Sequence, residues 1–331
     1  ADNLEFAVFP GLVGVPNLDD DDEDGAPDWS QIGLASGDND FSLANLSTNG
    51  NEIELSLDGP GIRIYQDEGL ILGEGTAEEF SVPSDVESLA LRVEFSDFMV
   101  QGTLVVRDLT LDSEFEVSLT SSPLLFNHHL QPAEKTVAAR GFDNEDFIAS
   151  FEDALGDAFF SINASTYAYD VWLQDEFEFG YATSPDVHLN VIFDTPRNRG
   201  LDDFPEDRYQ RPDWLIVYLD NEEDSISTYD SAGNLEVSPP VTVDGTAYPY
   251  GRIYYGGVTD TNEGPSMATQ NALASFKIQR PFAVDSSWLC VGHVSEFSST
   301  IPDPSAPKGF RLVFSNTDLA WALLETAGAF T

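Results

Sequence analysis

Apolar and polar residues alternate along short stretches between residues 53 and 119, as they do in strands that bury one face. Gly, Asp and Pro residues interrupt these stretches at the spacing of turns in a β-sandwich. The pattern predicts an antiparallel β-sandwich over residues 1–115, with an acidic loop near its start. The alternating stretches cover residues 53–57, 62–64, 89–95, 104–106 and 115–119.

The pattern changes after Pro123. Asn144 precedes two acidic residues and then apolar residues at helical spacing, which predicts an amphipathic helix over 144–155. A second helix is predicted over 267–277. Because strand-like stretches interleave with these helices, residues 116–331 form a second predicted domain, of the α/β or α+β class. The strand-like stretches cover residues 187–193, 215–219, 252–255, 287–294 and 310–314.

The chain is strongly acidic: its 331 residues include 59 Asp and Glu but only 14 Lys and Arg, which gives a formal net charge of -45. Such a charge repels the phosphates of nucleic acids and the anionic surface of membranes, so we expect neither as a partner. No stretch approaches about eighteen consecutive apolar residues, which argues against a transmembrane helix. The single cysteine, Cys290, excludes an internal disulfide and a zinc cluster built from cysteines.

Residues 17–25 (NLDDDDEDG) form the most acidic segment, and further acids follow at Asp28, Asp38 and Asp40. An amide and carboxylates at alternate positions, followed by a glycine, let a turning chain direct several oxygen ligands to one centre. Calcium accepts about six to eight such oxygens in a flexible geometry. A calcium-binding loop and a solvated acidic loop are the two interpretations of this segment.

A second acidic segment, residues 169–180, reads YDVWLQDEFEFG. If it is extended, Gln174, Glu176 and Glu178 share one face and Asp175 lies on the other. The row of oxygens could then hold a metal while Asp175 holds a substrate. The alternative is an edge strand with one charged and solvated face.

Residues 288–297 (WLCVGHVSEF) place His293 after a glycine at the end of a predicted strand. An imidazole titrates near neutral pH, as acid–base catalysis requires, although a lone histidine is also common in structural roles. Cys290 lies three residues before His293, a separation that sends two strand side chains to opposite faces. We therefore predict that Cys290 is a buried, structural thiol rather than a nucleophile.

Four segments carry a more specific signal: 171–181 (VWLQDEFEFGY), 191–201 (VIFDTPRNRGL), 230–243 (DSAGNLEVSPPVTV), and 291–297 (VGHVSEF) followed by 308–312 (KGFRL). Together they resemble the protein-arginine deiminases, calcium-dependent enzymes that hydrolyse peptidyl-arginine to peptidyl-citrulline. Their order and spacing are similar to the family's. The resemblance implies an immunoglobulin-like middle domain, which matches the predicted β-sandwich, followed by an incomplete α/β propeller of the pentein type.

The resemblance also implies a role for individual residues. Asp175 matches the aspartate that binds the substrate guanidinium, and His293 matches the general acid and base. Trp172 matches the wall along the arginine side chain, while Arg197 and Arg199 match residues that hold the substrate backbone.

Calcium is the cofactor that the resemblance implies, in two propeller sites and one site in the acidic loop. Bound calcium would neutralise carboxylates that otherwise repel one another. The first propeller site consists of Gln174, Glu178 and Glu236 with the carbonyl groups of Ala232 and Leu235; the second of Glu176, Asp194, Thr195 and Asn198; and the loop site of Asn17, Asp19, Asp21 and Asp40.

Two departures from the family's pattern bear on activity. The family's His-Val-Asp-Glu-Phe reads His-Val-Ser-Glu-Phe here, so Ser295 replaces the second aspartate that binds the guanidinium. The family's nucleophilic cysteine belongs to a C-terminal portion that this sequence does not reach by Thr331, and Cys290 occupies a different position. We therefore expect no turnover from this chain.

Three functions are compatible with these observations. The first is calcium-dependent hydrolysis of peptidyl-arginine to peptidyl-citrulline and ammonia, with arginine-containing proteins or peptides as partners. The second is a catalytically inactive, calcium-dependent binder of arginine-rich peptides, favoured by Ser295 and by the acidity. The third is an extracellular sandwich module stiffened by calcium. The family resemblance implies a soluble, cytoplasmic protein, with secretion as the alternative.

Overall fold

The chain divides into two compact units, each built from segments that are separated in the sequence. The predicted domain boundary near residue 115 stays a prediction. The first unit comprises Ala1–Leu125, Phe179–Asp194 and Asp203–Val217, and the second Phe126–Glu178, Thr195–Asp202 and Tyr218–Thr331. The computed structural model describes residues 11–33, 37–38, 40–197, 199–219, 226–258 and 263–328.

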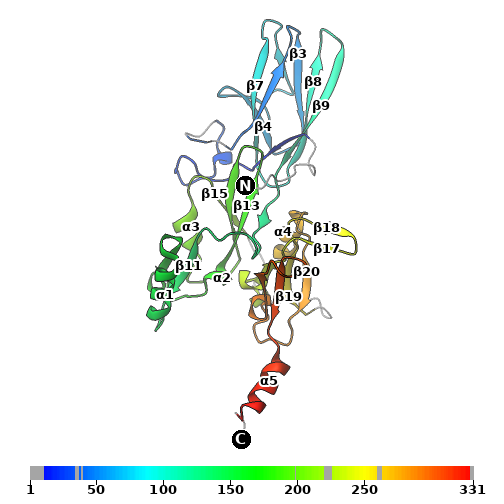
Figure 1. Cartoon of the computed structure of the whole chain (residues 1–331). Coiled ribbons are helices and arrows are strands. Elements are labelled where there is room, and N and C mark those ends of the chain that lie inside the picture. The colour runs from blue at the N-terminus through cyan, green and yellow to red at the C-terminus, as the bar shows by residue number, and fades with distance from the viewer. Residues whose placement is uncertain are drawn as a thin grey trace. The chain divides into compact units, whose positions relative to one another are not determined.

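Two sheets make up most of the first unit (Figure 1). One has the strand order β1-β9-β8-β3-β6, and the other has the order β2-β7-β4-β5. Neighbouring strands are antiparallel except β1 and β9, which run parallel. The strands are β1 (Leu12–Gly14), β2 (Ser42–Ser47), β3 (Ile53–Asp58), β4 (Ile62–Gln66), β5 (Gly69–Leu72), β6 (Glu79–Val82), β7 (Ser88–Phe95), β8 (Gln101–Asp108) and β9 (Ser113–Ser121).

Both sheets contribute side chains to one hydrophobic core. Leu55 and Val106 come from the first sheet, Ile64 and Val93 come from the second, and all four are at most 1% exposed. Because a strand directs successive side chains to opposite faces, this burial of alternate residues explains the alternating pattern. Truncating such a residue to alanine costs about 2–5 kcal/mol of stability. The strands predicted between residues 53 and 119 are confirmed.

A further sheet, of order β10-β13-β14-β15, contains the strands predicted over 187–193 and 215–219. In the first unit, the Tyr209 ring at the end of α3 contacts the rings of Phe179, Phe204 and Trp214, with centroids 4.5–5.9 Å apart. These aromatic contacts hold α3 against the sheet. The elements are β10 (Leu125–Phe126), β13 (Phe177–Thr183), β14 (His188–Asp194), α3 (Phe204–Tyr209) and β15 (Trp214–Tyr218).

The second unit combines small sheets with helices (Figure 1). The parallel strands β11 and β12 are joined by α1, β16-β19-β20 is a three-stranded sheet, and β17-β18 and β21-β22 are antiparallel pairs. Over the residues that are described, none of these sheets closes, and the incomplete propeller of the pentein type stays a prediction. The elements are β11 (Thr136–Arg140), α1 (Glu145–Leu155), β12 (Phe159–Asn163), α2 (Leu173–Glu176), β16 (Leu235–Val237), β17 (Val241–Val243), β18 (Thr246–Tyr248), β19 (Ile253–Gly257), α4 (Met267–Ser275), β20 (Phe282–Asp285), β21 (Ser298–Pro302), β22 (Phe310–Phe314) and α5 (Thr317–Thr326).

The two predicted helices are confirmed as α1 and α4. Ile148 of α1 is 0% exposed, as the amphipathic pattern requires. Asn144 precedes α1, but its side chain braces the approaching chain instead of capping the helix. Its Oδ1 accepts a hydrogen bond from the Gly141 amide (3.0 Å), and its Nδ2 donates to the Ala139 carbonyl (2.9 Å). No helix among the described residues is long and apolar enough to cross a membrane.

The strand predicted over 287–294 is wrong. These residues turn instead: the Leu289 amide donates to the carbonyl of Ser286 (3.0 Å), and Gly292 has a φ of +90°. A positive φ is incompatible with a continuous extended strand. Cys290 lies in this turn and is exposed, so the prediction of a buried thiol is also wrong.

Candidate functional site

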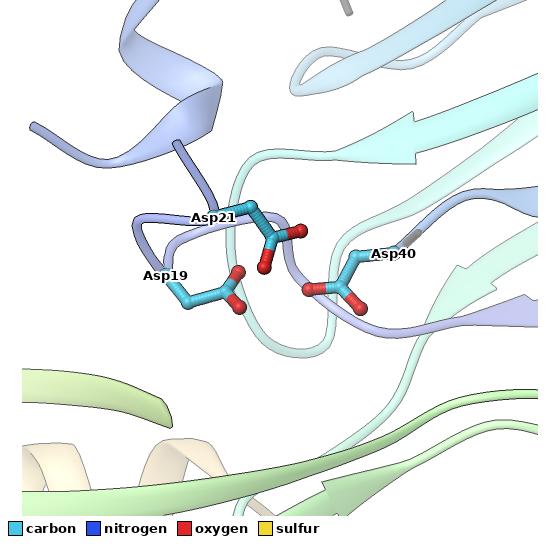
Figure 2. Close-up of side chains that lie close together, drawn as sticks. All are labelled: Asp19, Asp21 and Asp40. Carbon is cyan, nitrogen blue, oxygen red and sulfur yellow. The ribbon is translucent and has the colours of Figure 1, made fainter. Parts of the chain in front are cut away.

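The acidic loop of the first unit gathers carboxylates around one point. Oxygen atoms of Asp19, Asp21 and Asp40 lie within 4.8 Å of one another, and Figure 2 shows the three carboxyl groups facing a common space. Asp19 is 3% exposed and Asp40 is 1% exposed. The chain folds back on itself here, because the Asp28 amide donates to the carbonyl of Asp19 (2.9 Å).

Several oxygens of this cluster have no internal hydrogen-bond donor. Within the described part of the chain, no N–H or O–H group donates to either oxygen of Asp40, to Oδ1 of Asp19 or to Oδ1 of Asn17. Burial raises the pKa of Asp40, and the charge of Asp19 raises it further. Buried oxygens without partners are rare and costly. The set therefore fits a hard divalent cation such as calcium.

Folding brings further aspartates into range that the sequence spacing did not single out as ligands. Oxygens of Asp28 lie within 4.8 Å of Asp20 and Asp22 in one group, and of Asp21 and Asp38 in another. Burial raises the pKa of Asp28 to about 7. Alternate spacing could not reveal these groups, because they depend on the path of the loop rather than on neighbouring positions.

A fully satisfied carboxylate, Glu94 on β7, anchors the loop to the sheet. Glu94 is 0% exposed and accepts hydrogen bonds from Nδ2 of Asn17 (2.9 Å) and from the Tyr65 hydroxyl (2.9 Å). Nη1 of Arg63 lies 3.5 Å from Glu94, and the Arg63 guanidinium stacks on the Trp29 ring at 3.8 Å. Nδ2 of Asn17 also donates to Oδ2 of Asp38 in the acidic loop (2.9 Å), whereas Oδ1 of Asn17 has no described donor.

In the second unit, residues 173–176 form a helical turn, α2, and not a strand. The prediction that Gln174, Glu176 and Glu178 share one face of a strand is therefore wrong. The Asp175 amide closes this turn with a 3.0 Å hydrogen bond to the carbonyl three residues earlier. β13 starts only after α2. Within the turn Glu176 is buried whereas Gln174 is exposed, so the two side chains do not form a row.

The same unit brings Asp175 and His293 together. Nδ1 of His293 lies 3.5 Å from Oδ1 of Asp175. Nε2 of His293 lies 2.8 Å from the carbonyl oxygen of Thr228. Since a carbonyl oxygen can only accept a hydrogen bond, Nε2 is the donor. Gly233 makes room for the pair, since a Cβ there would lie 2.6 Å from Oδ1 of Asp175. A carboxylate thus lies beside an imidazole whose Nδ1 can carry or release a proton.

Arg197 lies buried among three carboxylates. Its Nη1 is 2.7 Å from Oε2 of Glu176 and 3.2 Å from Oδ2 of Asp170, and its Nε is 3.9 Å from Oδ2 of Asp175. Arg197 is only 4% exposed, so in this conformation it does not reach a substrate backbone. The side chain of Arg199, in contrast, is 57% exposed, and its Nε lies 3.6 Å from Oδ2 of Asp170.

Glu176 keeps one oxygen without a donor. Oε2 accepts from Arg197, whereas no described N–H or O–H group donates to Oε1. Burial raises the pKa of Glu176 to about 7. The Thr195 hydroxyl donates to the Glu176 carbonyl (2.7 Å) and so fixes the backbone here. Of the other predicted ligands of this site, Asp194 belongs to the first unit, at the end of β14, and Asn198 lies outside the described residues.

Glu236 on β16 is the buried carboxylate of the other predicted propeller site. It is 8% exposed, and burial raises its pKa to about 7. Nε2 of His129, a residue that the sequence pattern did not single out, lies 3.5 Å from Oε2 of Glu236. Leu235 is buried at the start of β16, Ala232 is buried shortly before it, and Glu178 is partly buried on β13. The groups of three described carboxylates whose oxygens lie within 4.8 Å of one another are in the acidic loop, and they include none of Glu176, Glu178 and Glu236.

Trp172 and Ser295 are the remaining predicted site residues. Trp172 is 59% exposed directly before α2, so its ring is accessible to a ligand. Ser295 is partly exposed in the short 3-10 helix Val294–Glu296, which follows His293. A hydroxyl group donates or accepts a hydrogen bond but carries no charge, so Ser295 does not balance a cation as an aspartate would.

Comparison with known proteins shows the family to which the chain belongs. The model of the protein-arginine deiminase family matches residues 112–329. The chain therefore belongs to the protein-arginine deiminase family, which confirms the resemblance seen in the four sequence segments.

Individual relatives match over part of their length. The chain is 40% identical to human protein-arginine deiminase type-4 over 210 residues, which cover 62% of this chain and 32% of the relative. It is 37% identical to the human type-1 protein over 233 residues (68% of this chain, 34% of the relative). It is 44% identical to the mouse type-1 protein over 158 residues (47% and 24%). The chain thus matches about a third or less of the length of these relatives.

Proposed function

We propose that this chain provides the guanidinium-binding part of a calcium-dependent protein-arginine deiminase site, which acts on arginine residues of proteins or peptides. The pairing of Asp175 with His293 carries the proposal. A carboxylate can hold a guanidinium cation, and an imidazole next to it can transfer the proton that deimination requires. Membership of the family supports the same reaction.

The proposed reaction assigns one task to each group. Asp175 holds the guanidinium by charge-assisted hydrogen bonds, and the exposed Trp172 lies along the arginine side chain. A cysteine thiolate, which the resemblance assigns to the family's C-terminal portion, attacks the guanidinium carbon. The C–N bond then breaks, and ammonia leaves with a proton from His293. Water hydrolyses the resulting thiouronium, which releases citrulline and the thiol. Because Thr228 holds Nε2 of His293, Nδ1 is the nitrogen that transfers the proton.

We propose calcium as the cofactor of both units. Buried oxygens of Asp40 and Glu176 that lack donors support this choice. Bound calcium would supply positive charge that offsets the crowded carboxylates. The residues proposed to hold it in the loop are Asn17, Asp19, Asp21 and Asp40, with Asp28 and Asp38. In the second unit they are Gln174, Glu178, Glu236, Ala232 and Leu235 at one site, and Glu176 and Thr195 at the other.

The same resemblance supports an architecture for the whole chain. We propose that residues 1–115 form an immunoglobulin-like middle domain and residues 116–331 part of a pentein propeller. The two sheets that share one core in the first unit are compatible with the former. The β-α-β unit of β11, α1 and β12 is compatible with the latter.

A second candidate function is calcium-dependent binding of arginine-rich peptides without turnover. Ser295 favours it, because the family pattern that goes with turnover has a second aspartate at this position, whereas a serine carries no charge. The only thiol of the sequence also lies in an exposed turn rather than in the strand that was predicted. Both functions bind the same ligand, an arginine peptide, and only the first converts it to citrulline. The formation of citrulline is therefore the signal that separates them.

Incubating the chain with an arginine peptide in millimolar calcium, and assaying citrulline and ammonia, tests the choice. Titration calorimetry of the same peptide reports binding alone. Binding without citrulline is expected of the second function, and also of the first when the thiolate that the resemblance assigns to the family's C-terminal portion is not supplied. Citrulline formation that Asp175→Asn abolishes supports the first. Absence of both signals, with calcium and with chelator, contradicts both functions.

A further inference from the structure

The second unit already contains a cation of its own at the place where we propose calcium. The guanidinium of Arg197 contacts Glu176 at 2.7 Å and Asp170 at 3.2 Å. All three side chains are nearly inaccessible, with exposures of 4%, 0% and 6%. The guanidinium therefore balances carboxylates that would otherwise be buried without compensation.

Glu176 is engaged on one side only. Oε2 accepts from Nη1 of Arg197, and Oε1 has no donor among the described residues. A divalent ion there and the guanidinium would both compete for one buried carboxylate. A divalent ion and a guanidinium that lie so close together repel each other strongly in a buried site. Glu176 therefore cannot bind both of them at full strength.

Asp170 differs from Glu176 in being fixed from the backbone. Its Oδ1 accepts from the Trp172 amide at 3.1 Å and from Nη2 of Arg197 at 3.4 Å. The other oxygen of Asp170, Oδ2, lies 3.6 Å from Nε of Arg199. Arg197 can therefore give up Glu176 and keep Asp170 as its anchor.

We propose that Arg197 is an internal counter-ion, which holds Glu176 while no divalent cation is present and releases it when calcium binds there. The inference rests on the proposed calcium site at Glu176. It gives Arg197 a task in the cation-free protein that differs from holding substrate. Binding at Glu176 and release of Arg197 are then two sides of one equilibrium, so removing the guanidinium must strengthen the binding of the ion.

The variant Arg197→Gln tests this in the full chain by two readouts that need no enzymatic activity. In chelator its melting temperature should fall by roughly 5–10 °C, because two buried carboxylates lose their cation. In titration calorimetry with calcium chloride, the affinity of the site at Glu176 should rise by roughly tenfold, within the range typical of coupled sites. Titration of Glu176→Gln shows which of the calcium-binding events belongs to Glu176, because this variant removes the charge of that carboxylate.

Arg140→Gln is the matched control. Arg140 forms a 2.9 Å ion pair with Glu152 in the same unit, but both side chains are exposed (43% and 52%). It should change neither the melting temperature in chelator nor the calcium affinity measurably. If Arg197→Gln does not fold, Arg197→Lys keeps the charge but loses the second hydrogen-bonding nitrogen and should still tighten calcium binding.

Unchanged or weaker calcium binding by the Arg197 variant, with the Glu176 variant losing a site, overturns the inference and leaves the calcium site in place. If Glu176→Gln leaves the calcium titration unaltered, the proposed site itself is wrong, and the inference is overturned with it.

Discussion

The two units bury carboxylates in different ways. In the loop of the first unit, Asp19 and Asp40 lie together with oxygens that no described group donates to. In the second unit, Glu176 and Asp170 surround the guanidinium of Arg197. We propose that a cation from solution balances the first cluster, whereas the second carries a cation within the chain. The comparison indicates that the cation-free protein should be weakest at the loop.

Glu94 shows that burial alone does not make a cation site. It lies in the same unit as Asp40 and is as deeply buried, yet its oxygens accept hydrogen bonds from Asn17 and Tyr65. The difference between the two carboxylates is the number of donors and not the depth. Hydrogen-bonded burial stabilises a carboxylate, whereas burial without donors requires an ion.

The largest expected effect is that of calcium on thermal stability. Each site at a calcium concentration about a hundred times its dissociation constant adds about 2.7 kcal/mol to the free energy of unfolding. Because calcium is proposed in both units, the melting temperature in millimolar calcium should exceed that in chelator by several degrees. Differential scanning calorimetry checks this, and identical curves would contradict calcium binding in both units.

A pair of substitutions sharpens the comparison between Asp40 and Glu94. Asp40→Asn removes a buried charge that lacks a donor, so it should raise stability in chelator by about 1–3 kcal/mol and lower it in calcium. Glu94→Gln removes a charge that is already satisfied, so it should lower stability in both conditions. Denaturant unfolding with and without calcium measures both variants. The same sign for Asp40→Asn in both conditions would rule out the loop site.

A smaller effect is expected at the substrate side of the second unit. Ser295→Asp should tighten binding of an arginine peptide by roughly tenfold, because the guanidinium gains a second anionic partner. It should not create citrulline. Ser295→Asn, which has a similar size but no charge, is the control and should leave affinity within about twofold. Equal affinities of all three proteins would remove Ser295 from the binding site.

The smallest effect is expected for Cys290→Ala. Cys290 is exposed in a turn, so the substitution should change the free energy of unfolding by no more than about 0.5 kcal/mol. Peptide binding should not change either. Thiol labelling of the native protein should go to completion at the rate of a free thiol. Loss of a citrulline signal in this variant would show instead that Cys290 takes part in the reaction.

The periodicity of apolar residues along the sequence predicted the strands and helices that bury one face against a core. β3, β7 and α1 were found because alternate or helically spaced residues, such as Leu55 and Ile148, face a core. The segment 173–178 was considered as an extended strand, yet it begins with a helical turn in which Glu176 is buried against Arg197. No local pattern reports a contact between residues 21 positions apart.

The candidate site shows the same division. The family resemblance identified Asp175 and His293 as site residues, and the fold places them 3.5 Å apart. The contribution of Asp28 to the loop and the burial of Arg197 could not be predicted, since each depends on how distant segments meet. Cys290 was misjudged because a strand was assumed where Gly292 forces a turn.

The central claim is that Asp175 forms a guanidinium site that needs calcium. Titration calorimetry of the full chain with a short arginine peptide tests it most directly, in calcium and in chelator, for the unchanged protein and for Asp175→Asn. The account predicts saturable binding only in calcium, weakened at least tenfold by Asp175→Asn because a charge-assisted hydrogen bond is lost. Binding that is equally tight in chelator, or that Asp175→Asn leaves unchanged, would contradict the account.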